Sequence, residues 1–305
     1  MHGLKALNFY MLVERERWQG CPITRQGFFR PEYADFYKRL LFFVRQYRIW
    51  SLRRSPAALV LLNFDMGRYA ALASTLHVAH SELYGFPSEL FKVDLDLGLR
   101  WDVAREADDR RFDNWSGSVI SGLEARQMDY DLADTHIDLE RLSRYPLVFV
   151  PMVDFMDSED LSRLLTYAER GGQLVIGPGL PYLDPALCPS DVATQCIKQQ
   201  GQTKFGQGSV WWIDQASIPS VIDALARPAE YTCDDPQISL LTQANADYTL
   251  LFVANPTPQQ RSAEVRFSGS RHLKRVWGEV CNCSGEGAVN FEMEPYTVQI
   301  WEVLL

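Results

Sequence analysis

Two short apolar runs, separated by an amphipathic segment, occupy the middle of the chain. The runs cover residues 147–150 and 174–176, and proline or glycine closes each of them. Runs of this length are typical of strands buried on both faces of a parallel sheet. Between them, apolar residues recur at helical spacing: Leu161, Leu164, Leu165 and Ala168. We predict a strand-helix-strand unit, in which a ligand would lie beyond the carboxyl ends of the strands.

Polar residues and glycines predict the two ends of the central helix. Ser158 is the expected N-cap, and Glu159 and Asp160 follow in the first turn, where the positive end of the helix dipole favours acidic side chains. Gly171 and Gly172 are suited to the left-handed conformation that ends many helices. The helix is therefore expected to run from about residue 158 to residue 170.

The flanking pattern extends this unit into a larger α/β domain. Residues 57–65 read as a buried strand, and residues 69–84 are expected to be helical. The acidic stretch 86–115 predicts a surface loop, because its aspartates do not match the spacing of a calcium loop. A glycine turn at 206–208 leads into another strand, and it is not a phosphate-binding loop because no Lys-Ser/Thr follows it.

From residue 238 onward, the apolar positions alternate with a period of two. We predict strands over 250–253, 263–267, 273–280 and 296–303, with turns that include residues 268–270 and 284–287. This pattern is typical of a small antiparallel β-sandwich.

The amino-terminal part combines an apolar strand with an amphipathic helix. Residues 7–13 have the composition of a buried strand, which needs partners on both sides. A helix is predicted from about residue 31 to residue 50, with an apolar stripe at Phe36, Leu40, Phe43, Val44 and Tyr47. Residues 53–56 read as a linker.

Composition narrows the classes of function. The 305 residues carry a formal charge of −9, which argues against nucleic-acid binding. No apolar run approaches the roughly 20 residues of a membrane span, and the amino terminus lacks a signal core, so a cytoplasmic location without membrane contact is expected. The six scattered cysteines lack a CxxC pair, which favours reduced thiols without a bound metal.

Several segments together carry a resemblance to a known family. They are LNFYMLVERERWQGCPI, RPEYADFYKRL, RYPLVFVPMVDFMDSEDLSRLLTYAERGGQLVIGPG, FVANPTPQQRSAEVRF and EPYTVQIWEV. In this order they resemble the carboxyl-terminal part of the TIM-barrel β-galactosidases of glycoside hydrolase family 42. The resemblance implies a (β/α)8-barrel remnant over 1–55, with the eighth strand and closing helix. It further implies a flavodoxin-like, class I glutamine amidotransferase-like trimerisation domain over 56–228, and a β-sandwich over 229–305.

The resemblance also implies a function and its limits. The two catalytic glutamates of the family precede the eighth barrel strand, so no catalytic residue is assigned in this chain, and whether the chain is itself an enzyme stays open. Glu14, Arg15 and Trp18 are expected to form one wall of the sugar site, since an indole offers an apolar plane to a sugar ring. The implied partners are a β-galactoside or related sugar, and either further copies in a homo-oligomer such as a trimer or a complementing barrel chain. No cofactor is expected, and the chain alone is expected to be inactive.

The sequence also offers other interpretations. Glu14 and Glu16 lie two apart on a strand, about 6.5 to 7 Å between Cα atoms, which is compatible with an inverting glycosidase, although the alternating arginines favour ion pairs. A stand-alone amidotransferase-like hydrolase is disfavoured, because residues 176–179 carry no Cys, Ser or Thr. None of the five histidines has a catalytic or metal motif, including the pair His77 and His80. A non-catalytic carbohydrate-binding or protein-interaction module on the same scaffold remains the alternative.

Overall fold

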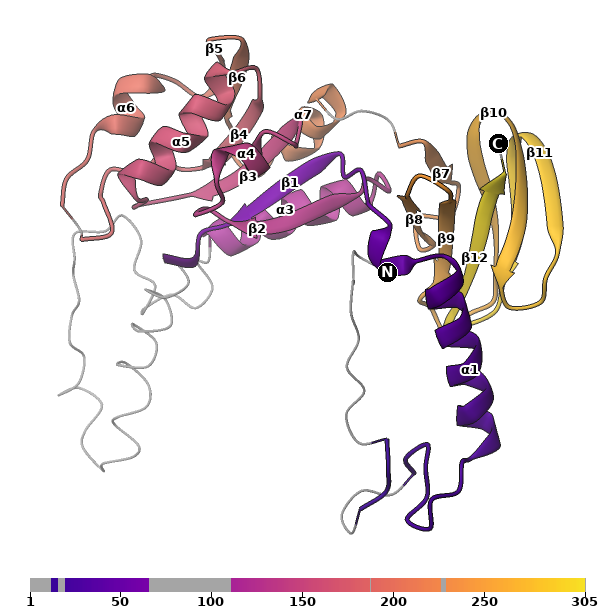
Figure 1. Ribbon diagram of the computed structural model, residues 1–305. Coiled ribbons are helices and arrows are strands. Elements are labelled where there is room, and N and C mark those ends of the chain that lie inside the picture. The colour runs from indigo at the N-terminus through magenta and orange to yellow at the C-terminus, as the bar shows by residue number, and fades with distance from the viewer. Residues whose placement is uncertain (1–11, 16–19, 66–110, 187, 226–228, 305) are drawn as a thin grey trace. The chain divides into compact units, whose positions relative to one another are not determined.

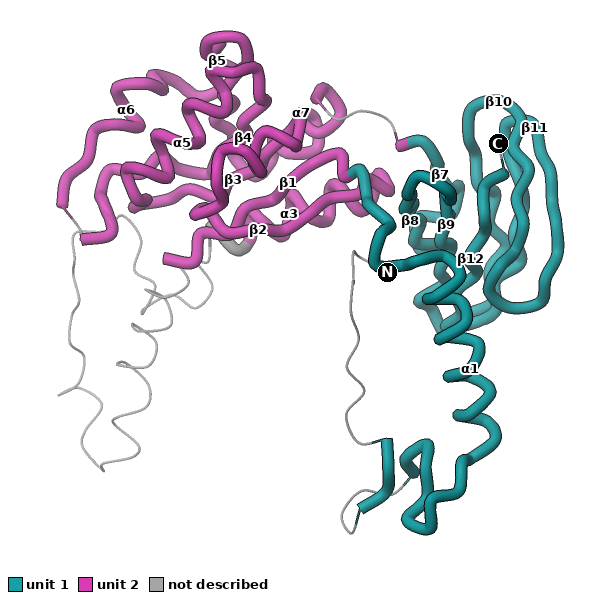
Figure 2. The backbone as a smooth tube through the Cα atoms, in the orientation of Figure 1, with its two compact units in different colours: residues 1–55, 230–305 teal, residues 56–229 magenta. Residues whose placement is uncertain are grey.

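The computed structural model describes residues 12–15, 20–65, 111–186, 188–225 and 229–304. The chain forms two compact units, one containing residues 1–55 and 230–305 and the other containing residues 56–229 (Figure 2). In the described residues, no helix is both long and apolar enough to cross a membrane.

The unit of residues 56–229 is built on a six-stranded sheet with the order β2-β1-β3-β4-β6-β5 (Figure 1). All neighbouring pairs are parallel except β5 and β6, so the antiparallel strand β5 lies at one edge. The strands are β1 (Ala58–Leu62), β2 (Tyr130–Asp134), β3 (Leu147–Met152), β4 (Gln173–Pro178), β5 (Gly201–Phe205) and β6 (Gly208–Trp212).

Helices pack on both faces of this sheet. Their bounds are α3 (Arg111–Glu124), α4 (Leu139–Leu142), α5 (Ser158–Glu169), α6 (Val192–Cys196) and α7 (Ile218–Leu225). Residues of α4, α5 and α6 share one apolar core with the sheet, and residues of α3 and α7 share a second core on the opposite face. Because both faces are covered, β3 is buried along its whole length, as expected for a parallel sheet.

The predicted strand-helix-strand element is confirmed as β3, α5 and β4, with one correction at its start. The N-cap is Asp157 rather than Ser158, and its carboxylate accepts hydrogen bonds from the backbone N–H groups of Glu159 and Asp160 at 2.7 and 3.2 Å. A charged carboxylate satisfies these free N–H groups and also complements the helix dipole. The helix ends at Glu169, and Gly171 has φ +111°, as the predicted stop requires.

The predicted loop over 86–115 is wrong at its carboxyl end, where α3 already begins at Arg111. Weak helix formers such as Ser116 and Gly117 hide the helix in the sequence. It is stabilised by tertiary packing, because Trp115, Val119 and Leu123 follow each other at four-residue spacing and are fully buried. The predicted helix 69–84 lies outside the described residues.

The second unit contains an antiparallel, β-sandwich-like sheet with the order β11-β10-β12-β9-β8, to which β7 adds by pairing with β10. Its strands are β7 (Tyr231–Cys233), β8 (Ser239–Ala244), β9 (Thr249–Asn255), β10 (Arg261–Trp277), β11 (Asn282–Met293) and β12 (Thr297–Leu304). The predicted turns at 268–270 and 284–287 are wrong, because both lie inside the long strands β10 and β11. A register shift between Arg266 and Ser270 absorbs Gly269, which has φ +71°.

Helix α1 (Pro31–Gln46) and the short 3-10 helix η1 (Ile49–Ser51) pack on one face of this sheet. Alternate residues of β9 divide between the two faces: Leu250 and Phe252 contact the core that contains Phe43 of α1, whereas Leu251 belongs to the opposite core. The predicted helix is thus confirmed, although it ends at Gln46 rather than near residue 50. Most of the predicted strand 7–13 lies outside the described residues.

Candidate functional site

Glu14, the first residue of the predicted sugar-binding wall, is held by two partners in the amino-terminal segment. Its carboxylate forms an ion pair with Arg30 and accepts a hydrogen bond from the Gly20 N–H at 2.9 Å. The hydrogen bond from Arg30 is the main cause that lowers the pKa of Glu14 below its ordinary value. The ionised form of Glu14 is therefore favoured, which suits a hydrogen-bond acceptor better than a proton donor.

Of the three predicted wall residues, the structure describes Glu14 and Arg15, so the prediction of a shared wall with Trp18 stays untested. The backbone carbonyl of Arg15 accepts a hydrogen bond from the Arg25 guanidinium at 3.2 Å, while Trp18 and Glu16 lie outside the described residues. Sequence reasoning missed Arg30, which lies immediately before α1 and is separated from Glu14 by 16 positions. Its basic charge just before a helix-initiating proline is the only signal that could have pointed to it.

A second candidate region lies at the carboxyl ends of β1, β2 and β3, where parallel sheets commonly bind ligands. Asn63, Thr135, Asp154 and Asp160 are polar, yet each is at most 4% exposed. Burying polar groups costs free energy unless they find partners. Their accumulation where the strands end therefore reflects a specific network. We call these four residues, with the side chains that contact them, the polar edge, meaning the carboxyl-terminal edge of the sheet.

His136 is the centre of the polar edge. Its Nδ1 lies 3.0 Å from Oδ2 of Asp160, and its Nε2 lies 3.7 Å from Oδ2 of Asp65. Arg163 forms an ion pair with Asp160 and donates a hydrogen bond to the backbone carbonyl of Thr135 at 3.2 Å. The buried Asp160 thus orients the imidazole, whose side chain is 47% exposed, for binding or proton transfer.

Sequence reasoning set His136 aside because no motif accompanies it. The only local signal was its place just after β2, near the acidic first turn of α5. β4 ends with Gly177 and Pro178, and Gly179 follows, so no side chain at this strand end can act as a nucleophile. Among the residues that the structure describes, no group of three or more His, Cys, Asp and Glu side chains is arranged to hold a metal ion.

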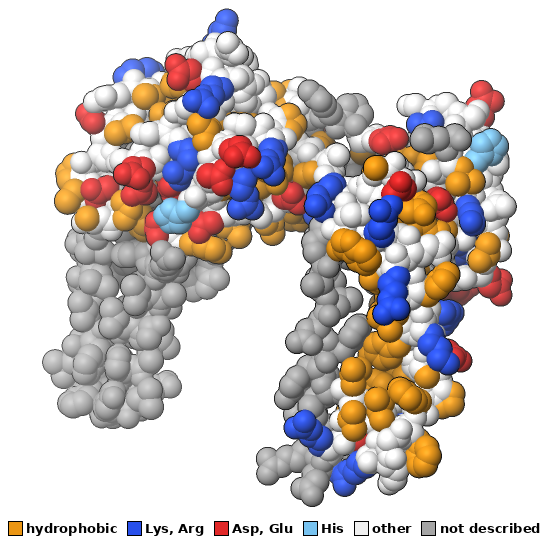
Figure 3. Space-filling model, viewed as in Figure 1, with side chains coloured by type: hydrophobic (Ala, Val, Ile, Leu, Met, Phe, Trp, Pro, Cys, Tyr) orange, Lys and Arg blue, Asp and Glu red, His pale blue; other side chains and the backbone are white. Residues whose placement is uncertain are grey.

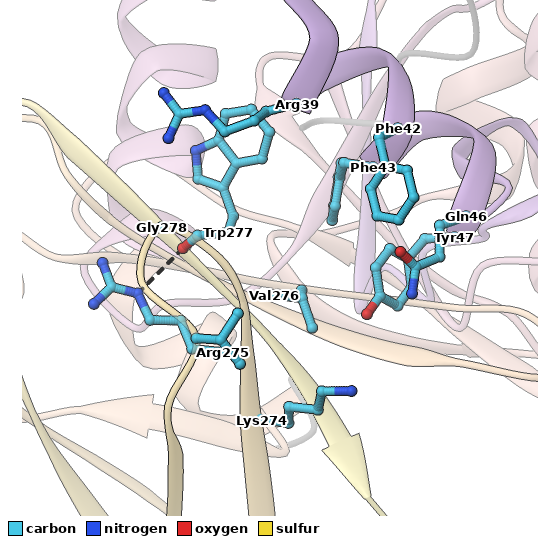
Figure 4. Close-up of a pocket in the computed structure, with 11 residues that line it drawn as sticks. Arg39, Phe42, Phe43, Gln46, Tyr47, Lys274, Arg275, Val276, Trp277 and Gly278 are labelled. Atoms are coloured by element: carbon cyan, nitrogen blue, oxygen red, sulfur yellow. Dashed lines mark hydrogen bonds between the residues drawn. The ribbon is translucent and has the colours of Figure 1, made fainter. Parts of the chain in front are cut away.

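A third region is a groove of about 220 Å³ between α1 and the end of β10 (Figure 4). We call it the α1–β10 groove. One wall comes from α1 and the other from the last residues of β10 and the turn that follows. Its lining consists of Arg39, Phe42, Phe43, Gln46, Tyr47, Lys274, Arg275, Val276, Trp277, Gly278 and Val280.

A β-bulge shapes the wall of this groove. Arg275 pairs with Trp301 and Trp277 pairs with Ile300, so Val276 is an extra residue without a partner across the strands. In a regular strand, consecutive side chains point to opposite faces, and a bulge removes this constraint. As a result Val276 and Trp277 both pack against the core that contains Phe43, and the Trp277 ring meets the Phe43 ring edge to face at 5.6 Å.

Sequence comparisons relate the chain to proteins that process sugars. Residues 100–237 match the family model described as GLMA-like, second domain. An exo-β-D-glucosaminidase from Pyrococcus horikoshii is 40% identical over 72 residues, which is 23% of this chain and 9% of that protein. A β-1,2-glucosyltransferase from Ignavibacterium album is 31% identical over 256 residues, or 80% of this chain and 34% of that protein.

Comparison with solved structures extends the likeness to nearly the whole chain. A catalytic mutant of a GH42 β-galactosidase from G. stearothermophilus has a TM-score of 0.60 at 13% identity, covering 95% of this chain and 47% of that chain. The chain therefore spans about a third or less of the curated relatives and about half of the solved enzyme. The predicted resemblance to a GH42-like carboxyl-terminal part is confirmed, as is the fold class of an α/β domain followed by a β-sandwich-like part.

Proposed function

We propose that this chain is the carboxyl-terminal portion of a β-galactosidase-like glycoside hydrolase and contributes one wall of a sugar site. The observation that carries the proposal is the fold likeness to a GH42 β-galactosidase over 95% of the chain. Because that enzyme is about twice as long, the catalytic residues would belong to a barrel portion that this chain does not contain. The chain alone would then be inactive, with Glu14, Arg15 and Trp18 as substrate-contacting residues.

The state of Glu14 supports a binding role. Retaining hydrolysis requires two carboxyl groups about 5 to 5.5 Å apart, of which one is protonated. The ion pair with Arg30 holds Glu14 in its ionised form. An ionised carboxylate can accept hydrogen bonds from sugar hydroxyls, but it has no proton to give to a leaving group.

Exposed apolar residues of α1 support contact with a barrel portion or with further copies of the chain, such as those of a trimer. Tyr33, Phe36, Leu41 and Phe42 are between 38% and 68% exposed, and hydrophobic side chains gather over α1 in Figure 3. A helix that is apolar on several faces is usually covered on several faces. Among the described residues, the sheet covers the face that carries Phe43 and Tyr47, and Trp277 of β10 also meets Phe36 edge to face. Tyr33, Leu41 and Phe42 therefore carry the apolar surface of α1 that is left for a partner.

The first experiment measures hydrolysis of a chromogenic β-galactoside by the purified chain, by its Glu14→Gln and Glu16→Gln variants, and by a Glu32→Gln control on the first turn of α1. We expect no hydrolysis from any of them. Hydrolysis by the parent chain that disappears in Glu14→Gln or Glu16→Gln would place a catalytic carboxylate in this chain and refute the proposal.

The second experiment adds a barrel portion from the same genome. Hydrolysis should then appear, and Glu14→Gln should weaken it mainly by raising KM, because a wall residue binds ground state and transition state alike. A β-D-glucosaminide belongs in the same assay, because the 40% identical relative is an exo-β-D-glucosaminidase. If no barrel restores hydrolysis while the chain binds sugars, the chain is the non-catalytic carbohydrate-binding module on this scaffold.

A further inference from the structure

The α1–β10 groove concentrates positive charge in an acidic protein. Arg39, Lys274 and Arg275 contribute to its lining, and none of the lining residues is acidic, although the whole chain carries a formal charge of −9. Within the part of the chain that the structure describes, no ion pair involves Arg39 or Lys274. Two cations at one small groove raise the local concentration of anions.

Arg275 has a fixed position at the edge of the groove. Its Nε donates a hydrogen bond to the backbone carbonyl of Trp277 at 3.1 Å, drawn as a dashed line in Figure 4. Its guanidinium lies against Gly278, where a Cβ atom would come within 2.7 Å of one of its nitrogens. Gly278 also has φ +103°, a backbone conformation that favours glycine independently of this close contact. The remaining guanidinium N–H groups of Arg275 can still meet a ligand.

Apart from the three cations, the lining of the groove is apolar or neutral. Phe42 is 68% exposed and Val280 is 75% exposed, so both present apolar surface to anything that enters. Gln46 supplies a neutral amide. The Tyr47 hydroxyl is already bonded to Glu302 at 3.2 Å, and burial is the main cause that raises its pKa, so this phenol stays neutral. Glu302 is thereby engaged with Tyr47 and does not line the groove.

We propose that the α1–β10 groove binds one ring of a sugar acid, with the carboxylate near Lys274 and an apolar ring face on Phe42. The volume of about 220 Å³ suits a single ring, since sites for drug-sized ligands span about 300 to 1,000 Å³. Charge and size follow from the groove alone, whereas the choice of a sugar rests on the proposed function. The amide of Gln46 and the three cations offer more hydrogen-bond donors than a carboxylate needs, which suits a ligand that also carries hydroxyls.

The test measures binding of D-glucuronate to the whole chain by titration calorimetry at low and high salt, beside D-glucose and benzoate. Glucuronate should bind, glucose and benzoate should bind at least about fivefold more weakly, and added salt should weaken glucuronate binding because exposed charges are screened. Failure of glucuronate to bind, or glucose binding equally well, overturns the proposal. Benzoate binding as tightly as glucuronate overturns the assignment to a sugar.

Variants locate the site. Lys274→Gln and Phe42→Ala should each weaken glucuronate binding about fivefold or more. The fold should tolerate both changes, because Phe42 is 68% exposed and the half-buried Lys274 is replaced by a polar side chain with a similar apolar stem. Arg45→Gln is the matched control, because Arg45 is an exposed cation of α1 that does not line the groove. Equal weakening by Arg45→Gln would overturn the location. Barrel-dependent hydrolysis of a β-galactoside is read separately, so failure of this inference and failure of the proposed function remain distinguishable.

Discussion

Replacing Asp160 with alanine is expected to destabilise the α/β unit through the polar edge. The Asp160 side chain is 5% exposed and is the shared acceptor of Arg163 and His136. Removing one partner of a buried ion pair costs about 3–5 kcal/mol, because the other charge stays buried without compensation. Here the Arg163 and His136 side chains are 24% and 47% exposed, so water replaces part of the lost interaction. We expect a loss of about 2–3 kcal/mol in the free energy of unfolding.

Scanning calorimetry of the full chain measures this loss. A domain of 150–250 residues shifts its Tm by about 2–4 °C per kcal/mol, so Asp160→Ala should lower the Tm of the α/β unit by about 4–12 °C. Hydrogen exchange should accelerate in α5 before it does in the antiparallel sheet. The Asp160→Asn variant, which keeps the shape and one acceptor, should lose less.

The matched control is Glu140→Ala in the same unit. Glu140 and Arg144 form an ion pair at 2.8 Å, but their side chains are 85% and 65% exposed, so its loss should cost no more than about 0.5 kcal/mol. If Asp160→Ala and Glu140→Ala shift the Tm equally, burial does not set the strength of the polar edge and the reasoning is refuted.

Three further predictions concern packing, glycine and pH. Phe43→Ala should lower the free energy of unfolding by about 3–5 kcal/mol and release α1 from the sheet, which a lower Tm would show. An unchanged Tm would contradict the packing described for α1. Gly117→Ala should raise the free energy of unfolding by about 0.5–1 kcal/mol, because a Cβ at this helical position meets open space. Gly177→Ala should instead yield an unstable protein, because its Cβ would collide with a backbone carbonyl. Equal Tm values for the two variants would refute this contrast. The lowered pKa of Glu14 contributes stability that is fully present above the ordinary value of 4.5 and is lost as the pH falls through the lower, folded-state value. Acid titration should therefore accelerate proteolysis of residues 12–30 in the parent chain, and Arg30→Gln should remove this pH dependence.

The pattern of apolar residues predicted the strands that are buried on both faces. β3 and β4 are buried on both faces, so their runs are continuously apolar and recognisable without a structure. By contrast, β2 and β5 are the two edge strands of this sheet, each with half-buried and exposed residues, and neither has a strong apolar pattern. The two long strands of the antiparallel sheet were broken in prediction at glycines, because a bulge and a turn contain the same residues.

The candidate sites likewise contain some residues that the sequence singles out and others that only the structure brings together. Glu14 could be singled out from its aromatic and charged neighbours, but its partner Arg30 could not, because an ion pair between distant positions leaves no periodic signal. His136 carries no motif, and it gains a role only because the residues after β1 and the first turn of α5 place Asp65 and Asp160 beside its two ring nitrogens. The α1–β10 groove joins residues more than 200 positions apart.

The sequence by itself determined the class of fold, the central strand-helix-strand element and the alternating sheet, because burial imposes a local period on the chain. Only the tertiary structure decided that α1 covers the carboxyl-terminal sheet, that Asp160 orients His136, and that Lys274 lies at the same groove as Arg39. The physical reason is that these arrangements depend on side-chain contacts between distant segments. Such contacts depend on the shape and charge of individual side chains, and they leave no period in the sequence.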